Sequence, residues 1–312
     1  MDLTTIQSAI NAASPGDYIF VFNGTYTENV VVNQSVWIIG ERQDITIIDG
    51  GGAGTVVNVT AGNVVLSAFT IQNSGNLPED AGIRLDGSTG SVINRNNLVN
   101  TNYSIYLTNS NANEILRNTG SSADFGLNLT NSNDNNIVFN VFKGDKVGIA
   151  LSAGSTGNNI TRNNVTQCTQ FGVLADSGGN LFFHNNFLNN QVQVGTDSIN
   201  TWDNGVVSGG NFWSNYTGVD VDHNGLGDTP QTIDASNADN FPLIRAANDT
   251  RLMTDLNDDR VTDMKDIGIT AKAYGSTPGS TKWNFLADVN GDLKVNLKDI
   301  SLTAANFMKT YP

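Results

Sequence analysis

Five asparagines at a near-constant interval are the feature of this 312-residue chain that most limits its fold. They recur about every 22 residues, within the range of periods that solenoid proteins show, and an apolar residue lies three positions before each. The asparagines are Asn96, Asn118, Asn140, Asn163 and Asn185, and the apolar residues are Ile93, Ile115, Ile137, Ile160 and Phe182. A second apolar column keeps the same period, at Ile105/Leu107, Leu127/Leu129, Ile149/Leu151 and Val173/Ala175. Together, these columns predict a solenoid.

The composition of each repeat indicates strands and turns. Its apolar runs are short, alternate with polar residues and are interrupted by Asn, Ser, Gly and Asp, whereas an amphipathic helix needs apolar residues every three or four positions. One such unit buries too little surface to offset the entropy of ordering its backbone. It is stable only when stacked on neighbours at the ~4.8 Å spacing of adjacent strands. The repeat therefore predicts an all-β, parallel β-helix.

The asparagine column has two possible roles in such a stack. Asparagine is a common turn residue, so the column can simply mark turns. An amide side chain also both donates and accepts, so it can bond the next turn of the solenoid at every step. We favour the hydrogen-bonded ladder, because turns alone would not hold one residue type in register five times.

The N-terminal part predicts a helix followed by irregular turns of the same stack. Residues Thr4 to Ala13 place their apolar side chains on one face before Ser14-Pro15-Gly16, which predicts a helix that covers the open end of the solenoid. Strand-like runs follow at Tyr18–Phe22, Val30–Val32, Val36–Ile39, Ile45–Ile48, Val56–Val59 and Val64–Ile71. A polar excursion over Asn73–Ala81 then precedes Gly82-Ile83-Arg84-Leu85, which lies one repeat ahead of the second apolar column.

The early segment Thr5–Asp17, followed by Asn23-Gly24-Thr25-Tyr26, resembles the opening of right-handed parallel β-helix proteins of the NosD-like, carbohydrate-associated type. With the Asn/Ile repeats and the segment Gly210–Tyr216, this resemblance covers residues 1 to about 244. It implies a right-handed β-helix with an N-terminal helix. The family includes surface proteins, periplasmic accessory proteins and sugar-acting enzymes, so the activity stays open.

Charge and composition exclude several partners. Residues 1–250 contain 22 acidic and 8 basic side chains, whereas residues 251–312 contain 8 of each. The lack of a basic stripe argues against nucleic acid and an anionic membrane surface. No apolar run approaches the ~18 residues of a membrane span. Cys168 is the single cysteine, so no intrachain disulfide forms. No signal peptide follows Met1, and we expect an extracellular or cell-surface protein whose export signal was removed, the alternative being a cytosolic one.

An acidic turn at residues 220–228, called the upstream turn below, predicts a cation site. It places oxygen side chains at loop positions 1, 3, 5 and 9, a glycine at position 6 and a backbone carbonyl at position 7, which is the spacing that Ca²⁺ requires. Position 12 is Gln231, which departs from that pattern. The candidate ligands are Asp220, Asp222, Asn224, Leu226 and Asp228.

The C-terminal region contains two acidic loops at matched spacing, each followed by a helical pattern. Both loops place oxygen side chains at positions 1, 3, 5, 9 and 12, with a carbonyl at position 7, as in a twelve-residue calcium loop. The first loop contains the ligands Asp255, Asn257, Asp259, Val261, Asp263 and Asp266, and the second contains Asp288, Asn290, Asp292, Lys294, Asn296 and Asp299. The helical patterns predict the same inward-facing, buried face for both helices, formed by Ile267, Thr270, Ala271, Tyr274 and by Ile300, Thr303, Ala304, Phe307.

This pair of loops, with Asp at position 12, resembles a dockerin module over about residues 252–310. The resemblance implies Ca²⁺ as cofactor and a cohesin-type partner, bound through loop positions 10 and 11, here Met264, Lys265, Leu297 and Lys298. Position 6 is Arg260 and Leu293 instead of glycine, and a left-handed conformation there costs about 1 to 2 kcal/mol. The predicted organisation is a parallel β-helix over 1–244, a linker over 245–251 and a dockerin-like domain over 252–312.

Three functions are compatible with this organisation. The first is an extracellular β-helix scaffold or binding protein that a calcium-dependent module joins to a cohesin-type partner. The second is a polysaccharide lyase or hydrolase delivered by that module, and the third is self-assembly with neighbouring copies. We assign no catalytic residue. The column Arg95, Arg117, Phe139, Arg162 and His184 has no acidic counterpart in register, and we interpret it as stacked turn residues.

Overall fold

The computed structural model describes residues 3–246 and 253–310. These residues form two compact units, one comprising residues up to 181 with 187–200, and the other residues 182–186 with the chain from 201 onward. Most of the predicted linker, residues 247–251, lies outside the described residues. None of the helices in the described ranges has the length and apolarity of a membrane span.

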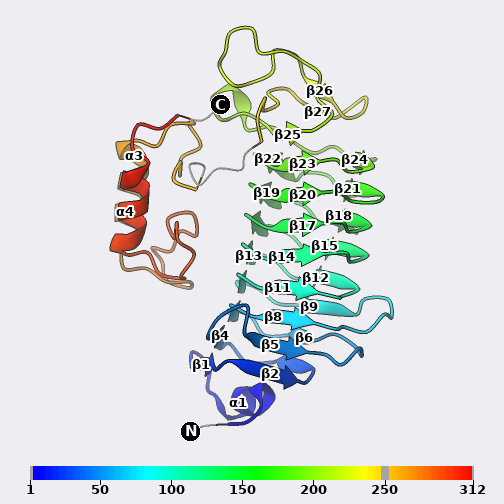
Figure 1. Cartoon of the computed structure of the whole chain (residues 1–312), viewed down its shortest axis with the longest axis vertical. Helices are drawn as coiled ribbons and strands as arrows, with labels where there is room; N and C mark the ends of the chain where they lie inside the picture. Colours follow the sequence, from blue (N-terminus) through cyan, green and yellow to red (C-terminus); the bar gives the residue numbers. More distant parts are fainter. Residues whose placement is uncertain (1–2, 247–252, 311–312) are drawn as a thin grey trace. The chain divides into compact units, whose positions relative to one another are not determined.

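The first unit is a parallel β-solenoid in which each turn contributes a strand to three sheets (Figure 1). The first sheet has the order β1 (Tyr18–Val21), β4 (Trp37–Gly40), β7 (Val65–Ser67), β10 (Val92–Asn94), β13 (Glu114–Leu116), β16 (Asn136–Val138), β19 (Asn159–Thr161) and β22 (Leu181–Phe183). The second begins β2 (Gly24–Thr27), β5 (Thr46–Asp49), β8 (Thr70–Gln72), β11 (Asn97–Val99), β14 (Thr119–Ser121), β17 (Val141–Lys143), β20 (Asn164–Thr166) and β23 (Asn186–Leu188). The third comprises β3 (Val30–Val32), β6 (Val57–Val59), β9 (Ala81–Asp86), β12 (Tyr103–Thr108), β15 (Phe125–Thr130), β18 (Val147–Ser152), β21 (Phe171–Ala175) and β24 (Val192–Thr196).

Both apolar columns predicted from the repeat lie in the solenoid core. Ile93 pairs with Ile115, which pairs with Ile137, and all three side chains have no exposed surface. The second column is equally buried from Ile105 to Ala175. A glycine opens three of these strands because the next turn is too close for a side chain. A Cβ on Gly148 would lie 2.7 Å from the Gly172 carbonyl oxygen.

The asparagine ladder is confirmed. The Nδ2 atoms of Asn96, Asn118 and Asn140 each donate to Oδ1 of the asparagine one turn later, at 3.1, 3.1 and 3.0 Å. The same Oδ1 atoms also accept from the backbone N–H groups of the preceding asparagines. A second ladder, not predicted from the sequence, runs in parallel through Asn113, Asn135, Asn158, Asn180 and Asn200. Both ladders satisfy polar groups that a tightly wound turn would otherwise bury unpaired.

The N-terminal helix and every predicted strand-like run are present, but the strands differ in number and at their ends, and β2 (Gly24–Thr27) was not predicted. Helix α1 (Ile6–Ala12) begins at the N-cap Thr5, whose hydroxyl accepts from the Ser8 N–H. The run predicted over Val64–Ile71 forms two strands, β7 and β8, because Ala68 adopts a left-handed conformation (φ 69°) between them. A continuous apolar run cannot by itself reveal such a corner.

The second unit begins with short elements after the last long strands: α2 (Gly205–Ser208), β25 (Phe212–Trp213), β26 (Gln231–Thr232) and β27 (Ala238–Asp239). Two buried tryptophans, Trp202 and Trp213, pack 6.0 Å apart between ring centroids. Asp239 is also buried and accepts hydrogen bonds from the Trp213 indole and the Asn211 N–H, at 2.8 and 2.7 Å. Burial raises the pKa of Asp239 to about 7.

The C-terminal module contains the helices α3 (Met264–Lys272) and α4 (Leu297–Ala305). Its core consists of Leu256, Ala273, Ala287, Val289 and Val295. The predicted helix faces are partly wrong. Thr270 and Thr303 are buried with their hydroxyls 3.4 Å apart, and Ile267 and Ile300 are half-buried. Ala271, Tyr274, Ala304 and Phe307 are exposed. Tyr274 and Phe307 lie beyond the helix ends, so helical periodicity does not govern where they point.

Candidate functional site

The two loops of the C-terminal module and the upstream turn have the same backbone curl. In each, the carboxylate at position 1 accepts from the N–H groups of positions 5 and 6. The distances are 3.2 and 2.8 Å at Asp255, 3.0 and 2.8 Å at Asp288, and 3.0 and 2.9 Å at Asp220. The position-3 oxygen accepts from the N–H of position 5, and the position-5 oxygen from that of position 7. The oxygens predicted as ligands at positions 1, 3 and 5 therefore surround one turn of backbone.

Position 12 of both module loops also caps the following helix. Asp266 and Asp299 occupy the third position of α3 and α4, and each completes a capping box with the position-9 residue, Asp263 or Asn296. The other oxygen of Asp266 accepts from the Leu256 N–H at 2.7 Å, and that of Asp299 accepts from the Asn290 N–H at 3.1 Å. Each position-12 carboxylate therefore joins the start of its loop to the start of its helix.

The upstream turn closes differently from the module loops. Gln231, its position 12, lies in β26 and pairs with Asp239 of β27, so it is part of a small antiparallel sheet. Asp228 at position 9 instead accepts from the Val221 N–H, at 2.7 Å. The turn is thus a nine-residue version of the curl, which the twelve-residue spacing in the sequence did not predict.

The carboxylates gather most closely in the second loop. Within the described residues, ligand atoms of Asp288, Asp292 and Asp299 lie within 4.8 Å of one another. In the first loop the Lys265 ammonium lies 2.8 Å from Asp259 and 3.7 Å from Asp263. Burial alone would raise the pKa of Asp259, but hydrogen bonds from Lys265 and Asn257 outweigh it and lower that pKa. The two loops therefore have the same backbone and different charge balance.

Position 6 adopts the left-handed conformation in all three cases. The φ angle is 63° at Arg260, 65° at Leu293 and 88° at Gly225. The two residues with a Cβ accept the strain expected from the sequence, which is about 1 to 2 kcal/mol each.

The residues predicted to bind a partner lie on the outer surface of the module. Met264 and Leu297, at position 10 of each loop, are both 66% exposed. Lys265 and Lys298 follow them and are exposed too. A shallow hollow beside α4 is lined by Asn290, Leu297, Lys298, Ser301 and Leu302.

The basic column beside the asparagine ladder has the structural role expected from the sequence. Arg95, Arg117, Phe139, Arg162 and His184 all have φ between 53° and 59° and form the corner before each ladder asparagine. The guanidinium carbons of Arg117 and Arg162 lie 5.1 and 5.5 Å from the centroid of the Phe139 ring. The column is a stack of corner residues.

A charged and aromatic surface on the third sheet was missed by the sequence analysis. Arg84 of β9 lies 3.2 Å from Glu79, 3.6 Å from Asp86 and 5.3 Å from the centre of the Tyr106 ring. Tyr103 stacks on Phe125 with centroids 4.8 Å apart. We call Glu79, Arg84, Asp86, Tyr103 and Tyr106 the Arg84 cluster. The signal was available, because Tyr106 lies one repeat after Arg84 and pairs with it directly.

These stacked parallel sheets define the chain as a parallel β-helix protein. The family model described as "Periplasmic copper-binding protein (NosD)" matches residues 10–218, more than half of the chain. The chain therefore belongs to the NosD family, as the resemblance over residues 1 to about 244 indicated. No curated protein matches the chain.

Solved structures similar to this chain are enzymes that act on polysaccharides. The catalytic domain of a GH87 α-1,3-glucanase in complex with nigerose is 17% identical, with a TM-score of 0.52 over 70% of this chain and 46% of that one. Pectin methylesterase from carrot is 16% identical, with a TM-score of 0.45 over 73% of this chain and 88% of that one. This chain spans less than half of the glucanase chain, and the likeness shows the fold alone.

Two residues of the β-helix that could bind the copper of the family's name, Cys168 and His184, do not suit it. Soft or borderline ligands such as Cys, Met and His select copper. Cys168 is buried, and burial raises the pKa of its thiol to about 12, which keeps it protonated. His184 Nε2 lies 2.7 Å from the Ser208 carbonyl oxygen, so that nitrogen already has a partner. The oxygen-only groups of the curled loops suit a hard cation instead.

Proposed function

We propose that this protein is a β-helix scaffold whose C-terminal module acts as a calcium-dependent docking module. The proposal rests on one observation, the shared curl of the twin loops with the second-loop carboxylates gathered within 4.8 Å. Three like charges so close repel one another unless a cation or protons neutralise them. Calcium, when bound, would supply that neutralising charge through oxygen ligands.

The residues of the chain do the remaining work of holding such an ion. Positions 1, 3, 5, 9 and 12 would supply side-chain oxygens, and Val261 and Lys294 would supply carbonyls at position 7. The position-1 carboxylates hold the turn, and Asp266 and Asp299 connect it to α3 and α4. Because the same atoms serve as ligands and as helix caps, ion binding and helix formation are coupled.

The partner that we propose for the module is a cohesin-type domain, as the dockerin resemblance implies. Exposed Met264 and Leu297 would provide apolar contacts, each followed by a lysine. Calorimetric titration with CaCl₂, followed by binding to a panel of recombinant cohesin domains with calcium or EDTA, tests the proposal. We expect two or three calcium sites and calcium-dependent capture. Absence of calcium binding would sink the proposal, and concentration-dependent self-association in calcium would favour assembly with copies of the chain.

A second candidate function is polysaccharide binding or cleavage by the β-helix, which the Arg84 cluster favours. Carbohydrate sites combine aromatic rings with carboxylates and arginine on one exposed face. The Arg84 cluster brings these residue types together, with Glu79 exposed, Tyr103 half-buried and Tyr106 buried beside Arg84. The polar excursion supplies Glu79, which adopts φ 71° beside Arg84. Affinity electrophoresis against α-glucans, pectin and alginate tests this function. Binding that E79Q/D86N abolishes would support it, and unchanged mobility of the wild type in every gel would contradict it.

We also propose that the protein works outside the cytoplasm. The proposal rests on the family model that the chain matches, which is described as a periplasmic protein. Fractionation of the source cells tests this location.

A further inference from the structure

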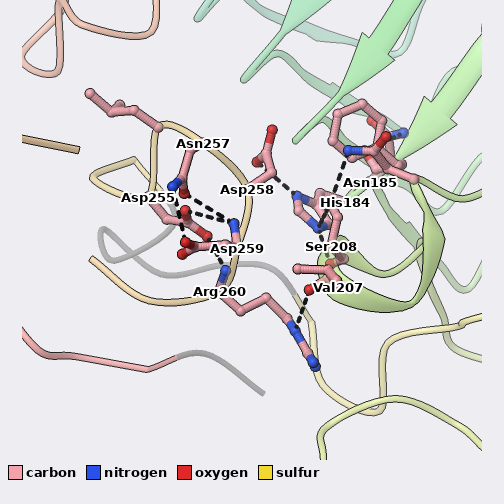
Figure 2. Close-up of polar contacts among 12 residues, drawn as sticks. His184, Asn185, Val207, Ser208, Asp255, Asn257, Asp258, Asp259 and Arg260 are labelled. Atoms are coloured by element: carbon pink, nitrogen blue, oxygen red, sulfur yellow. Dashed lines mark hydrogen bonds and ion pairs between the residues drawn. The ribbon is translucent and has the colours of Figure 1, made fainter. Parts of the chain in front are cut away.

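Arg260 is the residue at position 6 of the first loop, and its side chain reaches outside the module. Its Nε donates to the Val207 carbonyl oxygen at 3.0 Å (Figure 2). Its NH1 donates to the Asn224 carbonyl oxygen at 2.5 Å. Val207 lies in α2 and Asn224 is position 5 of the upstream turn. One guanidinium thus joins the first loop to two separate segments that precede the module.

A second contact supports the first. The Oδ1 atom of Asp258, at position 4 of the first loop, lies 3.5 Å from Nδ1 of His184. His184 is 1% exposed, and its other ring nitrogen lies 2.7 Å from the Ser208 carbonyl oxygen, next to the Val207 carbonyl that Arg260 contacts (Figure 2). Asp258 therefore reaches α2 through His184, beside the residue of α2 that Arg260 contacts directly.

The second loop has no equivalent of these contacts among the described residues. Leu293 occupies its position 6 and is 7% exposed, as part of the module interior. Position 4 is Gly291, which has no side chain. The two loops have nearly the same backbone, so the difference lies in the side chains at positions 4 and 6. A loop that served only to bind an ion would not need a long, doubly bonded arginine at its most strained position.

We propose that the first loop is an internal contact surface whose occupant is this chain's own segment 205–228, and that calcium controls the contact. The inference rests on the proposed function, because it takes the first loop to be a calcium loop.

Calcium control follows from the position of Arg260 in the curl. Its backbone N–H donates to Asp255 Oδ2 at 2.8 Å, so the position-1 carboxylate determines where the arginine side chain starts. An ion that fixes the curl therefore fixes the guanidinium against Val207 and Asn224. By linkage, these contacts raise the calcium affinity of the first loop by the same factor. Asn224 belongs to the upstream turn, so cation binding there would be coupled to the first loop as well.

Hydrogen–deuterium exchange of the full-length protein tests this contact, with R260L as the variant because leucine is the residue at the equivalent position of the second loop. K282L is the matched control, since it removes an exposed lysine of the same module. In calcium we expect peptides covering 205–228 to exchange at least about fivefold faster in R260L than in the wild type or K282L. In EDTA we expect the wild type and R260L to exchange alike.

R260G is the second variant, because glycine relieves the strain of the left-handed backbone at this position while removing the same contacts. It should fold at least as well as R260L and show the same faster exchange of 205–228. Equal exchange of this segment in calcium for the wild type, R260L and R260G would overturn the proposal. Faster exchange in both variants without any calcium dependence would overturn calcium control of the contact, while leaving the contact itself and the proposed function. Calcium binding with no effect of either variant would overturn the contact alone.

Discussion

The β-helix and the C-terminal module bury acidic and amide groups in opposite ways. In the β-helix, Asn140 is enclosed by other amides and carbonyls one turn away, so every polar atom meets a neutral partner. In the module, Asp288 and Asp299 are buried beside Asp292, so carboxylates face carboxylates. The comparison teaches that the repeat stabilises itself through its neighbours, whereas the module gathers like charges that a bound cation, as proposed above, would neutralise.

Removal of calcium should produce the largest effect among the tests of this difference. EDTA should unfold residues 253–310 with loss of most of the helical signal of α3 and α4, because the small module core cannot offset charge repulsion. The β-helix should stay folded. Far-UV circular dichroism with limited proteolysis measures both parts, and a tail that resists protease equally with and without EDTA would contradict the comparison.

Asn140→Ala tests the ladder. The substitution leaves the Asn118 N–H, the Asn118 amide and the Ile115 carbonyl without their partners in the core. We expect a loss of about 4 kcal/mol in the free energy of unfolding, measured by urea denaturation. Asn97→Ala is the control, because this half-buried strand residue has no side-chain hydrogen bond among the described contacts, and it should cost less than about 1 kcal/mol. Equal losses would mean that the ladder adds nothing.

Asp145 is an exception in the β-helix core, because it is a buried carboxylic acid where the ladder positions have neutral amides. One of its oxygens accepts from the Ala123 N–H at 2.8 Å, the other has no hydrogen-bond partner, and burial raises its pKa to about 7. The raised pKa means that the folded state holds a proton that the unfolded state releases near pH 4. The contribution of protonated Asp145 to the free energy of unfolding is therefore complete at low pH and is lost as the pH rises toward 7.

Asp145→Asn should remove this pH dependence. Asn190 accepts from the Cys168 N–H in the same way with a neutral amide, so asparagine fits such a corner. We expect the variant to be more stable than the wild type by roughly 3 kcal/mol at pH 8 and nearly unchanged at pH 4. Denaturant titrations at both pH values measure it, and a constant difference across pH would show that Asp145 does not titrate in this range.

Lys265→Met should produce the smallest effect and separates the two module loops. Calcium must displace the Lys265 ammonium from Asp259, whereas Lys298 has no ion pair among the described residues. An exposed ion pair of this kind is worth less than about 1 kcal/mol. We therefore expect the calcium affinity of the first loop to rise by up to about fivefold in the Lys265→Met variant. Lys298→Met controls for the lost charge and should change the second-loop affinity less, as calorimetry with CaCl₂ can measure.

Much of the fold could be predicted because the chain repeats itself. The repeat period aligns Ile93 with Ile115 and Asn96 with Asn118, and the observed register follows that alignment. Corners such as Ala68 were missed, since an ordinary residue in a left-handed conformation leaves no mark in the apolar pattern. The second asparagine ladder was missed although it has the same period, because its asparagines lie among many other turn asparagines.

Less of the candidate sites could be predicted. Loop spacing indicated candidate ligands in the first and second loops, which stay a prediction, and the structure shows that the two loops share one backbone curl. The closure of the upstream turn by Asp228 could not be predicted, because Gln231 lies in a β-pair formed with a strand further along the chain. The Arg84 cluster was overlooked because Glu79 comes from an excursion whose course the sequence does not specify.

By itself, the sequence determined the stacked turns, their register and the acidic loops, because each depends on spacing along the chain and on the chemistry of single residue types. Only the tertiary structure decided which side chains meet across those elements. The guanidinium of Arg260 and the carbonyls of Val207 and Asn224 are far apart along the chain. Such contacts depend on how the chain returns on itself, and no local pattern records that path.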